Sequence, residues 1–396
     1  MSINYSDFRQ ELIGKYNDLD ILASITHYLQ NRGSFRTKYF ENVAIEHLTA
    51  DFPHLLEGQI VWDVPFSPPD SYKFTFIDLF AGIGGFRIAF QRLKGKCVFG
   101  SEWDKYARLV YLDNFGEAPF GDITKIKDSD IPEHDVLLAG FPCQAFSIAG
   151  RQAGFEDTRG TLFYEIVRIV KAKKPQAFLL ENVKGLEHHR SGQTLKTILK
   201  VLRCDLGYYV PDPKILNAKH FGLPQNRERI FIVGFLNSSL ASCFEYPETP
   251  DNGNGGMVAD ILEKDPVSVK YYLSQQYLTT LKQHRAKHEA KGHGFGYQVL
   301  NDTSTANTLV VGGMGQERNL VVDKRLTNFT PITNIKGSVN KQYIRRLTPL
   351  EFQRLQGFPE KFKRYITDTQ AYKQFANAVA VPVVEAIGNK LIRALE

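Results

Sequence analysis

The feature that most constrains the fold is an alternation, from Phe74 onward, of short apolar runs with segments of helical periodicity. Apolar runs of about four to eight residues are typical of buried strands, and apolar side chains three or four residues apart are typical of helices. Strands that alternate with helices predict a mainly parallel sheet covered by helices on both faces, the doubly wound α/β architecture. The expected strand–helix pairs are 74–80 with 84–93, 97–101 with 104–114, 135–139 with 161–171 and 177–180 with 194–206, and a late strand follows at 230–235.

The regions on either side of this pattern have a different texture. The first 70 residues predict helices at 7–16, 18–31 and 37–49, and a Pro-rich segment at 64–69 predicts a boundary because proline disfavours helix before it. After Asn237 the sequence is rich in Gly, Asn, Thr and Ser, with short strand-like pieces such as 319–323. We expect four parts: a helical N-terminal extension (1–70), an α/β domain (71–236), a smaller irregular domain (237–342), and a C-terminal part that returns to the α/β domain (343–396).

The composition excludes several classes of protein. With 43% apolar and 23% charged residues among 396, the chain can bury a large core and is not of the disordered class. Its apolar runs fall short of the roughly 18 residues that span a bilayer, and its N-terminus lacks a signal-peptide pattern, so we expect a cytoplasmic protein. The net charge of +6 is compatible with a polyanionic partner but does not require one.

The four cysteines are widely spaced and form neither a Cys-x-x-Cys pair nor a Cys/His cluster. This pattern predicts no disulfide framework and no metal site. Cys97, Cys204 and Cys243 are expected to fill apolar space. Cys143 differs from them, because it follows Pro142 at the exit of a predicted buried strand and is therefore placed in a cleft, where a thiol can react.

Ligands of open parallel sheets bind outside the carboxyl ends of the strands, so the strand ends indicate the site. The first predicted strand runs into a glycine turn at 82–85, the second ends at Glu102 and Trp103, and Asp122 follows the next element. The turn lacks the Gly-x-Gly-x-x-Gly spacing of a pyrophosphate cradle, which disfavours a nicotinamide dehydrogenase. Two acids, a Trp and a glycine turn suit a nucleoside that carries a positive centre. Close packing at the glycines and an ordinary turn at Asp122 remain the plainer alternatives.

Two further strand ends carry ionisable groups. Glu181 follows a buried strand at the same edge as Cys143, so we expect it to be partly desolvated and able to donate a proton. Arg227 and Arg229 precede the late strand at positions i and i+2, so they point the same way if extended and can converge on one ligand or phosphate. A surface Glu and a plain charged strand entry are the alternatives.

Five segments occur in order along the chain: 76–85 (FIDLFAGIGG), 140–144 (GFPCQ), 181–183 (ENV), 225–229 (QNRER) and 345–359 (RRLTPLEFQRLQGFP). Together they resemble the successive motifs of the DNA (cytosine-5)-methyltransferases of the prokaryotic modification type. The resemblance covers residues 74–236 and 343–396, and a variable segment lies between them where that family keeps its target recognition domain. It implies a doubly wound, Rossmann-like methyltransferase sheet with a second, smaller target-recognition domain.

The resemblance implies catalytic roles for Cys143, Glu181, Arg227 and Arg229. Cys143 would add as a thiolate to C6 of cytosine, which turns C5 into a nucleophile able to accept a methyl group. Glu181 would bind N3 and the exocyclic amine, Arg229 would hold O2, and Arg227 would lie beside the thiol and favour its anion. A duplex hides C6, so the cytosine must be flipped out of the stack.

The resemblance also implies S-adenosylmethionine as the methyl donor. Phe80 and Trp103 would flank the adenine, Glu102 would hold the ribose, and Asp122 with Ile123 would hold the adenine edge. Where the family has Gly-Asn-Ser, this chain has Ala376-Asn377-Ala378, which removes a hydroxyl contact. The implied cofactor-binding residues are Phe80, Gly82, Ile83, Gly84, Gly85, Glu102, Trp103, Asp122, Ile123, Pro142, Asn377 and Val379.

The implied macromolecular partner is double-stranded DNA. Gln144 and Ser147, just after Cys143, resemble groups that brace or close over a flipped base. In the variable domain, four cations between residues 282 and 291 are candidates for phosphate contact, and Gln316 and Arg318 are candidates for reading base edges. A solvated helix and loop is the plainer alternative for both groups.

The function implied is site-specific methylation of cytosine C5, which would protect DNA from a partner restriction endonuclease. We expect a monomer that acts without a metal and without direct contact with that endonuclease. Methylation of transfer RNA at cytosine C5 and a catalytically inactive DNA-binding module are the alternatives. The variable domain and the N-terminal extension favour duplex DNA, and the presence of both Cys143 and Glu181 argues against an inactive module.

Overall fold

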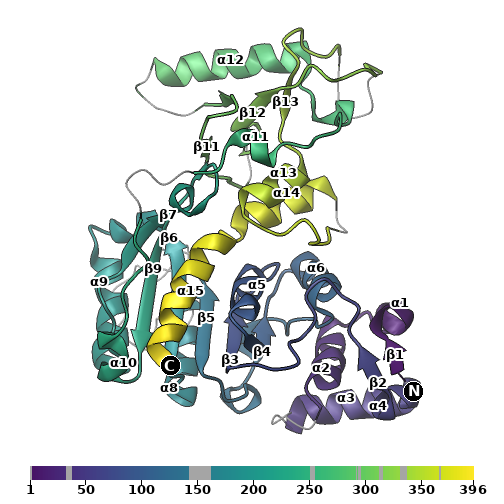
Figure 1. Ribbon diagram of the computed structural model, residues 1–396, viewed down its shortest axis with the longest axis vertical. Helices are drawn as coiled ribbons and strands as arrows, with labels where there is room; N and C mark the ends of the chain where they lie inside the picture. Colours follow the sequence, from purple (N-terminus) through teal and green to yellow (C-terminus); the bar gives the residue numbers. More distant parts are fainter. Residues whose placement is uncertain are drawn as a thin grey trace.

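The computed structural model describes residues 2–32, 38–141, 162–249, 255–290, 292, 296–311, 315–330, 337–364 and 367–396. It divides into a lower lobe around a six-stranded sheet, an upper lobe with a three-stranded sheet, and a group of N-terminal helices beside the lower lobe (Figure 1).

The six-stranded sheet has the strand order β4-β3-β5-β6-β9-β7. The first four strands are parallel, and β9 is antiparallel to both of its neighbours, so the predicted mainly parallel α/β sheet is confirmed. The β7 strand was not predicted, because it is a four-residue edge strand without a long apolar run. The strands are β3 (Phe74–Leu79), β4 (Gly95–Ser101), β5 (Val136–Gly140), β6 (Ala177–Val183), β7 (Lys214–Asn217) and β9 (Glu228–Phe235).

Helices cover both faces of this sheet, and successive strand residues alternate between two apolar clusters. In β5, for example, Leu138 packs in the cluster beneath α5 and α15, whereas Leu137 and Ala139 pack in the cluster on the opposite face. Burial on both faces explains why the strands are almost continuously apolar. The helices of the lower lobe are α5 (Gly85–Arg92), α6 (Lys105–Phe115), α8 (Leu162–Lys173), α9 (Gln193–Lys200, continued by a π-helical turn at Val201–Asp205), α10 (Ser238–Ser242) and α15 (Val381–Leu395).

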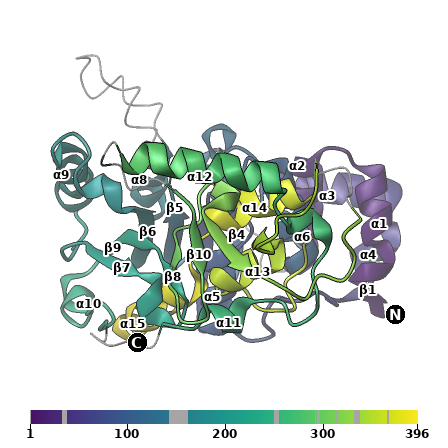
Figure 2. The ribbon, with the colours of Figure 1, turned by 90° about the horizontal axis from the view of Figure 1, so that it is seen from above.

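The N-terminal extension forms the predicted helices and packs beside α6 (Figures 1 and 2). A short parallel pair of strands, of three residues each, was not predicted because neither strand is long enough to show an alternating pattern. The elements are β1 (Ser2–Asn4), α1 (Tyr5–Lys15), α2 (Leu19–Gln30), α3 (Lys38–Asp51), α4 (Pro53–Glu57) and β2 (Gln59–Val61).

The upper lobe holds the less regular part of the chain, and α13 and α14 join it to the lower lobe. Its three-stranded sheet has the order β10-β12-β13, and β11 pairs with β8, which comes from the lower lobe. The elements of the upper lobe are α11 (Val258–Ile261), α12 (Gln275–Glu289), β10 (Gln298–Leu300), β11 (Ala306–Asn307), β12 (Asn319–Val322) and β13 (Ile344–Arg346). The lower-lobe strand is β8 (Gln225–Asn226), and the joining helices are α13 (Pro349–Leu355) and α14 (Asp368–Asn377).

The described cysteines depart in part from the sequence prediction. Cys97 is buried in β4, as expected for a residue that fills apolar space. Cys204 and Cys243 are exposed, so the prediction was wrong for both. Cys204 lies in the π-helical turn after α9 and Cys243 ends the short helix α10, and in these positions the side chains point outward.

One stretch of the described chain, Asp368–Leu395, is long and apolar enough to cross a membrane by length and composition. It comprises α14 and α15, which are separate helices joined at 378–380, and 61% of its most apolar window is buried inside the protein. A helix in the core of a folded protein can be equally long and apolar. Because most of this stretch is buried inside the protein, α14 and α15 are core helices.

Candidate active site and cofactor pocket

The glycine turn lies at the carboxyl end of β3 and opens toward unfilled space. Gly82 has a φ of +55°, and among the described residues nothing lies within 4 Å of where its Cβ would be. Gly84 has a φ of +86°, and a Cβ there would meet the Phe115 ring at 2.3 Å. The first glycine therefore leaves room for a ligand, and the second is required by packing against α6. Ile83 points into the core, so only its backbone can face a ligand.

Glu102 joins the end of β4 to this turn. The side chain is buried, and its two oxygens accept hydrogen bonds from Gly82 N at 2.8 Å and Asp104 N at 2.7 Å. Burial raises the pKa of this carboxyl. Each oxygen keeps a second lone pair, which can accept from a hydroxyl. Next to it, the Trp103 side chain is 83% exposed, so its ring is free to stack against a planar ligand.

The third predicted acid, Asp122, begins a 3₁₀ turn at Ile123–Lys125. Its Oδ1 accepts from the backbone N (3.1 Å) and the hydroxyl (2.8 Å) of Thr124. This is the ordinary Asp turn that the sequence analysis gave as the plainer alternative for Asp122. Its hydrogen bonds fix the direction of the carboxylate. Ile123 is buried in the core, so its side chain does not line the pocket.

Val379, from the segment before α15, closes the space between two strand ends. A Cβ on Gly85 would lie 2.7 Å from Val379 Cγ2, and one on Gly140 would lie 4.0 Å from Val379 Cγ1 and 3.5 Å from Glu181 Oε2. Gly140 and Glu181 are also opposite each other in the β5–β6 register. The sequence-predicted residues of three strands and the C-terminal part therefore meet at one edge of the sheet, as expected.

Glu181 forms an ion pair with Arg229, with 3.0 Å between Oε1 and Nε. The two side chains are 12% and 16% exposed, so the pair is largely withdrawn from water but open on one side. The Arg229 Nη1 also donates to Glu228 O at 2.8 Å. A carboxylate acceptor and a guanidinium donor thus lie side by side at the strand ends, a pattern able to bind a ring with adjacent donor and acceptor groups.

Arg227 has different protein partners from Arg229. It lies at the break between β8 and β9, and its fully buried guanidinium donates to Ala376 O (3.0 Å), Ala378 O (2.8 Å) and Leu309 O (3.4 Å). Burial, together with the Arg229 charge, lowers the pKa of Arg227 to about 9, so it remains a cation at neutral pH.

These contacts explain how the chain tolerates the two alanines of its altered motif. Ala376 and Ala378 contact Arg227 through their backbone carbonyls, which are present whatever side chain these two residues carry. The missing hydroxyl therefore leaves the Arg227 contacts intact. Asn377, between them, is the exposed last residue of α14.

Two residues at this edge were quoted within motifs but given no role. Asn182 is buried, and its Nδ2 donates to Phe141 O at 2.8 Å, which anchors the chain two residues before Cys143. Asp78 is fully buried just before the glycine turn, and neither of its oxygens makes a hydrogen bond of normal geometry among the described residues. Desolvation raises its pKa well above the ordinary value. A polar residue inside an apolar strand was the available signal in both cases.

Four of the predicted site residues lie outside the described residues: Pro142, Cys143, Gln144 and Ser147.

The predicted recognition residues lie in the upper lobe. Gln316 is held in place, because its Oε1 accepts from Arg346 Nη1 at 2.7 Å. The backbone carbonyl of Arg318 accepts from Gln298 N at 3.0 Å, and its side chain is partly exposed. Of the cations predicted on α12, Arg285 pairs with Glu289.

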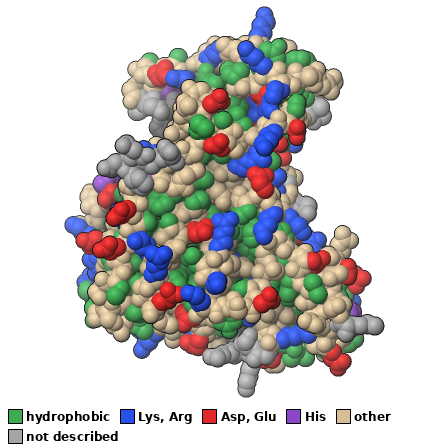
Figure 3. Space-filling model, in the orientation of Figure 1, with side chains coloured by type: hydrophobic (Ala, Val, Ile, Leu, Met, Phe, Trp, Pro, Cys, Tyr) green, Lys and Arg blue, Asp and Glu red, His purple; other side chains and the backbone are tan. Residues whose placement is uncertain are grey.

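Two surface features complete the site's surroundings. Figure 3 shows a hollow on one side between the two lobes, with Lys and Arg side chains above and below it.

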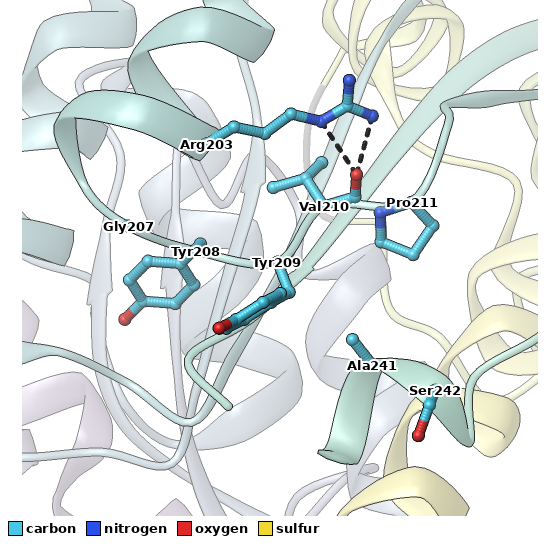
Figure 4. A pocket seen from close by; sticks show the side chains of 8 residues that line it. All are labelled: Arg203, Gly207, Tyr208, Tyr209, Val210, Pro211, Ala241 and Ser242. Carbon is cyan, nitrogen blue, oxygen red and sulfur yellow. Dashed lines mark hydrogen bonds between the residues drawn. The ribbon is translucent and has the colours of Figure 1, made fainter. Parts of the chain in front are cut away.

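A cavity of about 600 Å³ lies elsewhere, where α10 meets the turn before β7, and is lined by Arg203, Tyr209 and Ser242 among others (Figure 4). The Arg203 guanidinium there is bound to Val210 O, so the cavity holds no unpaired cation of its own. Its Tyr209 pairs with Phe235, the last residue of β9, which places the cavity at the sheet edge opposite to Glu181.

The fold and the strand-end site are those of a methyltransferase acting on cytosine. Residues 74–393 match the family model described as C-5 cytosine-specific DNA methylase, and the chain belongs to this family. It is 59% identical to the type II methyltransferase M.HpaII of Haemophilus parainfluenzae over 325 residues, which is 82% of this chain and 90% of that protein. It is 46% identical to M1.ScrFI of Lactococcus lactis subsp. cremoris over 334 residues, covering 84% of this chain and 81% of that protein.

Solved structures show the same fold at low identity. The Dnmt2 methyltransferase of S. pombe has a TM-score of 0.61 at 18% identity, covering 82% of this chain and 99% of that one. An E. coli prophage protein titled a putative DNA modification methyltransferase has a TM-score of 0.54 at 20% identity, covering 82% and 99%.

The chain is therefore a DNA cytosine-C5 methyltransferase, its substrate is DNA, and S-adenosylmethionine is its methyl donor. The relatives named as type II methyltransferases favour this activity over the alternatives of transfer-RNA methylation and of an inactive DNA-binding module. The described strand ends fit the cofactor, because the space at Gly82, the buried Glu102 carboxylate and the exposed Trp103 ring offer contacts to an adenosine and its attached amino acid.

Proposed function

We propose that Cys143 is the nucleophile and that Glu181, Arg229 and Arg227 are the other catalytic residues. The observation that carries the proposal is the Glu181–Arg229 pair at the carboxyl end of β6, beside Gly140, the residue that ends β5. In the sequence, Cys143 follows Gly140 by three residues. A cytosine that enters this edge presents N3 and N4 to a carboxylate and O2 to a guanidinium.

In the reaction the Cys143 sulfur forms a bond with C6 of the flipped cytosine, and the ring electrons move toward C5. Glu181 stabilises the charge that this addition places on N3, and Arg229 stabilises it at O2. S-adenosylmethionine supplies the methyl group. Solvent water then accepts the C5 proton, and the electrons of the C5–H bond restore the ring double bond while the C6–sulfur bond breaks and releases Cys143 as a thiolate. The buried cation of Arg227 favours the thiolate over the thiol.

The cofactor pocket is proposed to comprise Phe80, the turn at 82–85, Glu102, Trp103, Asp122, Ile123, Pro142, Asn377 and Val379. Gly82 and Glu102 support it most directly, since an open backbone and a buried carboxylate lie 2.8 Å apart at the point where two parallel strands end. Ile83 and Ile123 would contribute backbone atoms only.

We further propose that residues 237–342 select the DNA sequence, with Gln316 and Arg318 as reading residues and Gln144 and Ser147 bracing the flipped site. Residues 1–70, 71–236 and 343–396 would form the extension and the catalytic domain. The basic side chains around the hollow between the lobes support the placement of duplex DNA there. Protection of DNA from a partner endonuclease, action as a monomer and a cytoplasmic location belong to the same proposal. The relatives named type II methyltransferases support the first of these.

The decisive experiment compares Cys143→Ala with the native chain. DNA carrying 5-fluorocytosine should trap the native enzyme covalently, because fluorine at C5 cannot leave as a proton. The variant should bind DNA without trapping or methyl transfer. Normal turnover by Cys143→Ala would contradict the assignment. Bisulfite sequencing of DNA from expressing cells gives the target sequence.

A further inference from the structure

The loop that leads from α6 to the proposed adenosine contacts, residues 115–121, is covered by helix α2 of the N-terminal extension. Three polar side chains on one face of α2 satisfy backbone groups of this loop, and two glycines, Gly116 and Gly121, make the loop's own backbone permissive. The bonds join Gln30 Nε2 to Phe115 O (2.6 Å), Ala118 N to Thr26 Oγ1 (3.0 Å) and Gly121 N to Asp20 Oδ1 (3.0 Å).

A buried charge cluster joins the same helix to the loop and to the helix after the glycine turn. Glu117 of the loop is paired with His27 of α2 and with Arg87 of α5, the latter at 2.7 Å. Burial opposes ionisation of Glu117, but the Arg87 charge and His27 outweigh it and lower its pKa to about 2. Breaking one side of such a buried cluster would leave a charge without its partner, so the helix is firmly tied to the loop.

The opposite side of the loop is bonded to the end of β4, where Glu102 lies. Phe120 N donates to Gly100 O and Glu102 N donates to Phe120 O, both at 2.8 Å, and Ser101 Oγ donates to Gly121 O at 2.8 Å. The loop therefore lies between α2 and the strand end that carries Glu102, and a displacement of α2 would be passed to Glu102 and Asp122 through main-chain bonds.

Asp20 has the most specific position of the α2 residues. Its carboxylate also pairs with Arg108 at 2.6 Å, and Arg108 in turn donates to Pro119 O at 2.9 Å. A Cβ at Gly121 would come within 2.9 Å of Asp20 Oδ1. The residue before Asp122 is thus a glycine in direct contact with a carboxylate of the extension.

We propose that α2 is a positioning element of the cofactor pocket, with Asp20 and Thr26 as positioning residues that fix the loop and thereby Glu102 and Asp122 for the adenosine half of S-adenosylmethionine. The inference rests on the cofactor site proposed above. It gives a role to a segment that precedes the family match, which begins at residue 74. A loop held in its binding conformation before the ligand arrives loses less freedom on binding, which raises affinity.

The test measures S-adenosylmethionine binding to the full chain by calorimetry, together with KM and kcat. The Asp20 side chain is 62% exposed, so Asp20→Ala should leave the fold intact. The variant loses the acceptor for Gly121 N and the partner of Arg108. Its cofactor Kd and KM should rise about fivefold or more, with kcat and DNA affinity unchanged. Asp20→Asn keeps an oxygen that accepts from Gly121 N and should restore most of the affinity. Glu11→Ala, at an exposed carboxylate on α1, is the matched control.

A second pair of variants addresses the buried bond. Thr26→Val removes the acceptor for Ala118 N at nearly constant shape and should weaken cofactor binding, whereas Thr26→Ser should not. Native cofactor affinity in folded Asp20→Ala would overturn the inference, and so would a parallel loss of kcat and DNA affinity, which indicates general damage. Glu102→Ala is the reference: native cofactor affinity in that variant would instead overturn the proposed pocket itself.

Discussion

Removing the Arg227 guanidinium should destabilise the protein as well as impair catalysis, and the structure gives the size of the effect. Arg227→Ala withdraws donors from three backbone carbonyls. The carbonyl of Ala378 keeps a partner, because Gln356 Nε2 also donates to it at 3.0 Å. The bond to Leu309 O is long, at 3.4 Å, so its loss costs little.

The main loss is therefore at Ala376 O, where a buried carbonyl is left without the charged donor. An unsatisfied buried acceptor costs about 1–3 kcal/mol, and the emptied space beside it adds a cavity cost, so we expect a loss of about 2–4 kcal/mol in the free energy of unfolding. Arg227→Lys keeps the charge but can follow only part of the forked geometry, and should lose about half as much.

Urea unfolding followed by circular dichroism measures these values. The matched control is Lys184→Ala, whose ion pair with Glu228 is exposed to solvent, and which should lose about 1 kcal/mol or less in stability. A native unfolding midpoint for Arg227→Ala would refute the reasoning, because it would mean that the carbonyls of the C-terminal segment do not depend on this side chain.

Two further predictions concern a buried acid and the recognition lobe. The raised pKa of Asp78 means that folding favours its protonated form, so stability falls as pH rises above about 4, the value in an unfolded chain. Asp78→Asn should therefore gain more over the native chain at pH 8 than at pH 5 in urea unfolding, and an equal difference at both would contradict the assignment. Arg318→Ala should cost about 1–3 kcal/mol in binding to the cognate site if it reads a base, with relaxed specificity at one position. Uniform weakening on all sequences in competition assays would instead indicate a phosphate contact.

The sequence predicted the architecture of the lower lobe because its strands are buried on both faces. A run such as the one in β5 has only one stable environment, the middle of a sheet covered by helices, and the motif residues at its end then follow from topology. Several short strands were not predicted, among them β1, β2 and β7, because they are too short to carry a periodic signal. They form because neighbouring elements offer main-chain groups for hydrogen bonding. Those partners lie far away in the sequence, so the residues of the short strands do not reveal them.

In the candidate site, too, some residues could be predicted from the sequence and others could not. Glu102, Glu181 and Val379 could be placed from motifs because each follows a strand or precedes a helix whose position is determined by burial. The partners of Arg227 could not be predicted, because they are backbone carbonyls from segments 82 to 151 residues away along the chain. The role of α2 was equally out of reach of the sequence, since polar residues on a helix face usually indicate solvent and here satisfy a buried loop.

The contacts of the 225–229 motif with the C-terminal part give these residues a structural role that precedes any contact with the base. Gln225 accepts from Leu309 N of the upper lobe at 3.2 Å and donates to Gln356 at 3.0 Å. Gln356 and Arg227 then hold the carbonyls at 375–378, and the next residue, Val379, packs on Gly85 of the cofactor turn. A continuous set of buried contacts therefore runs from the lobe proposed to read DNA to the pocket proposed to hold the cofactor. Rigid placement of the two substrates relative to each other is what transfer of a single methyl group demands, because reacting atoms must approach to within about 3–3.5 Å in line.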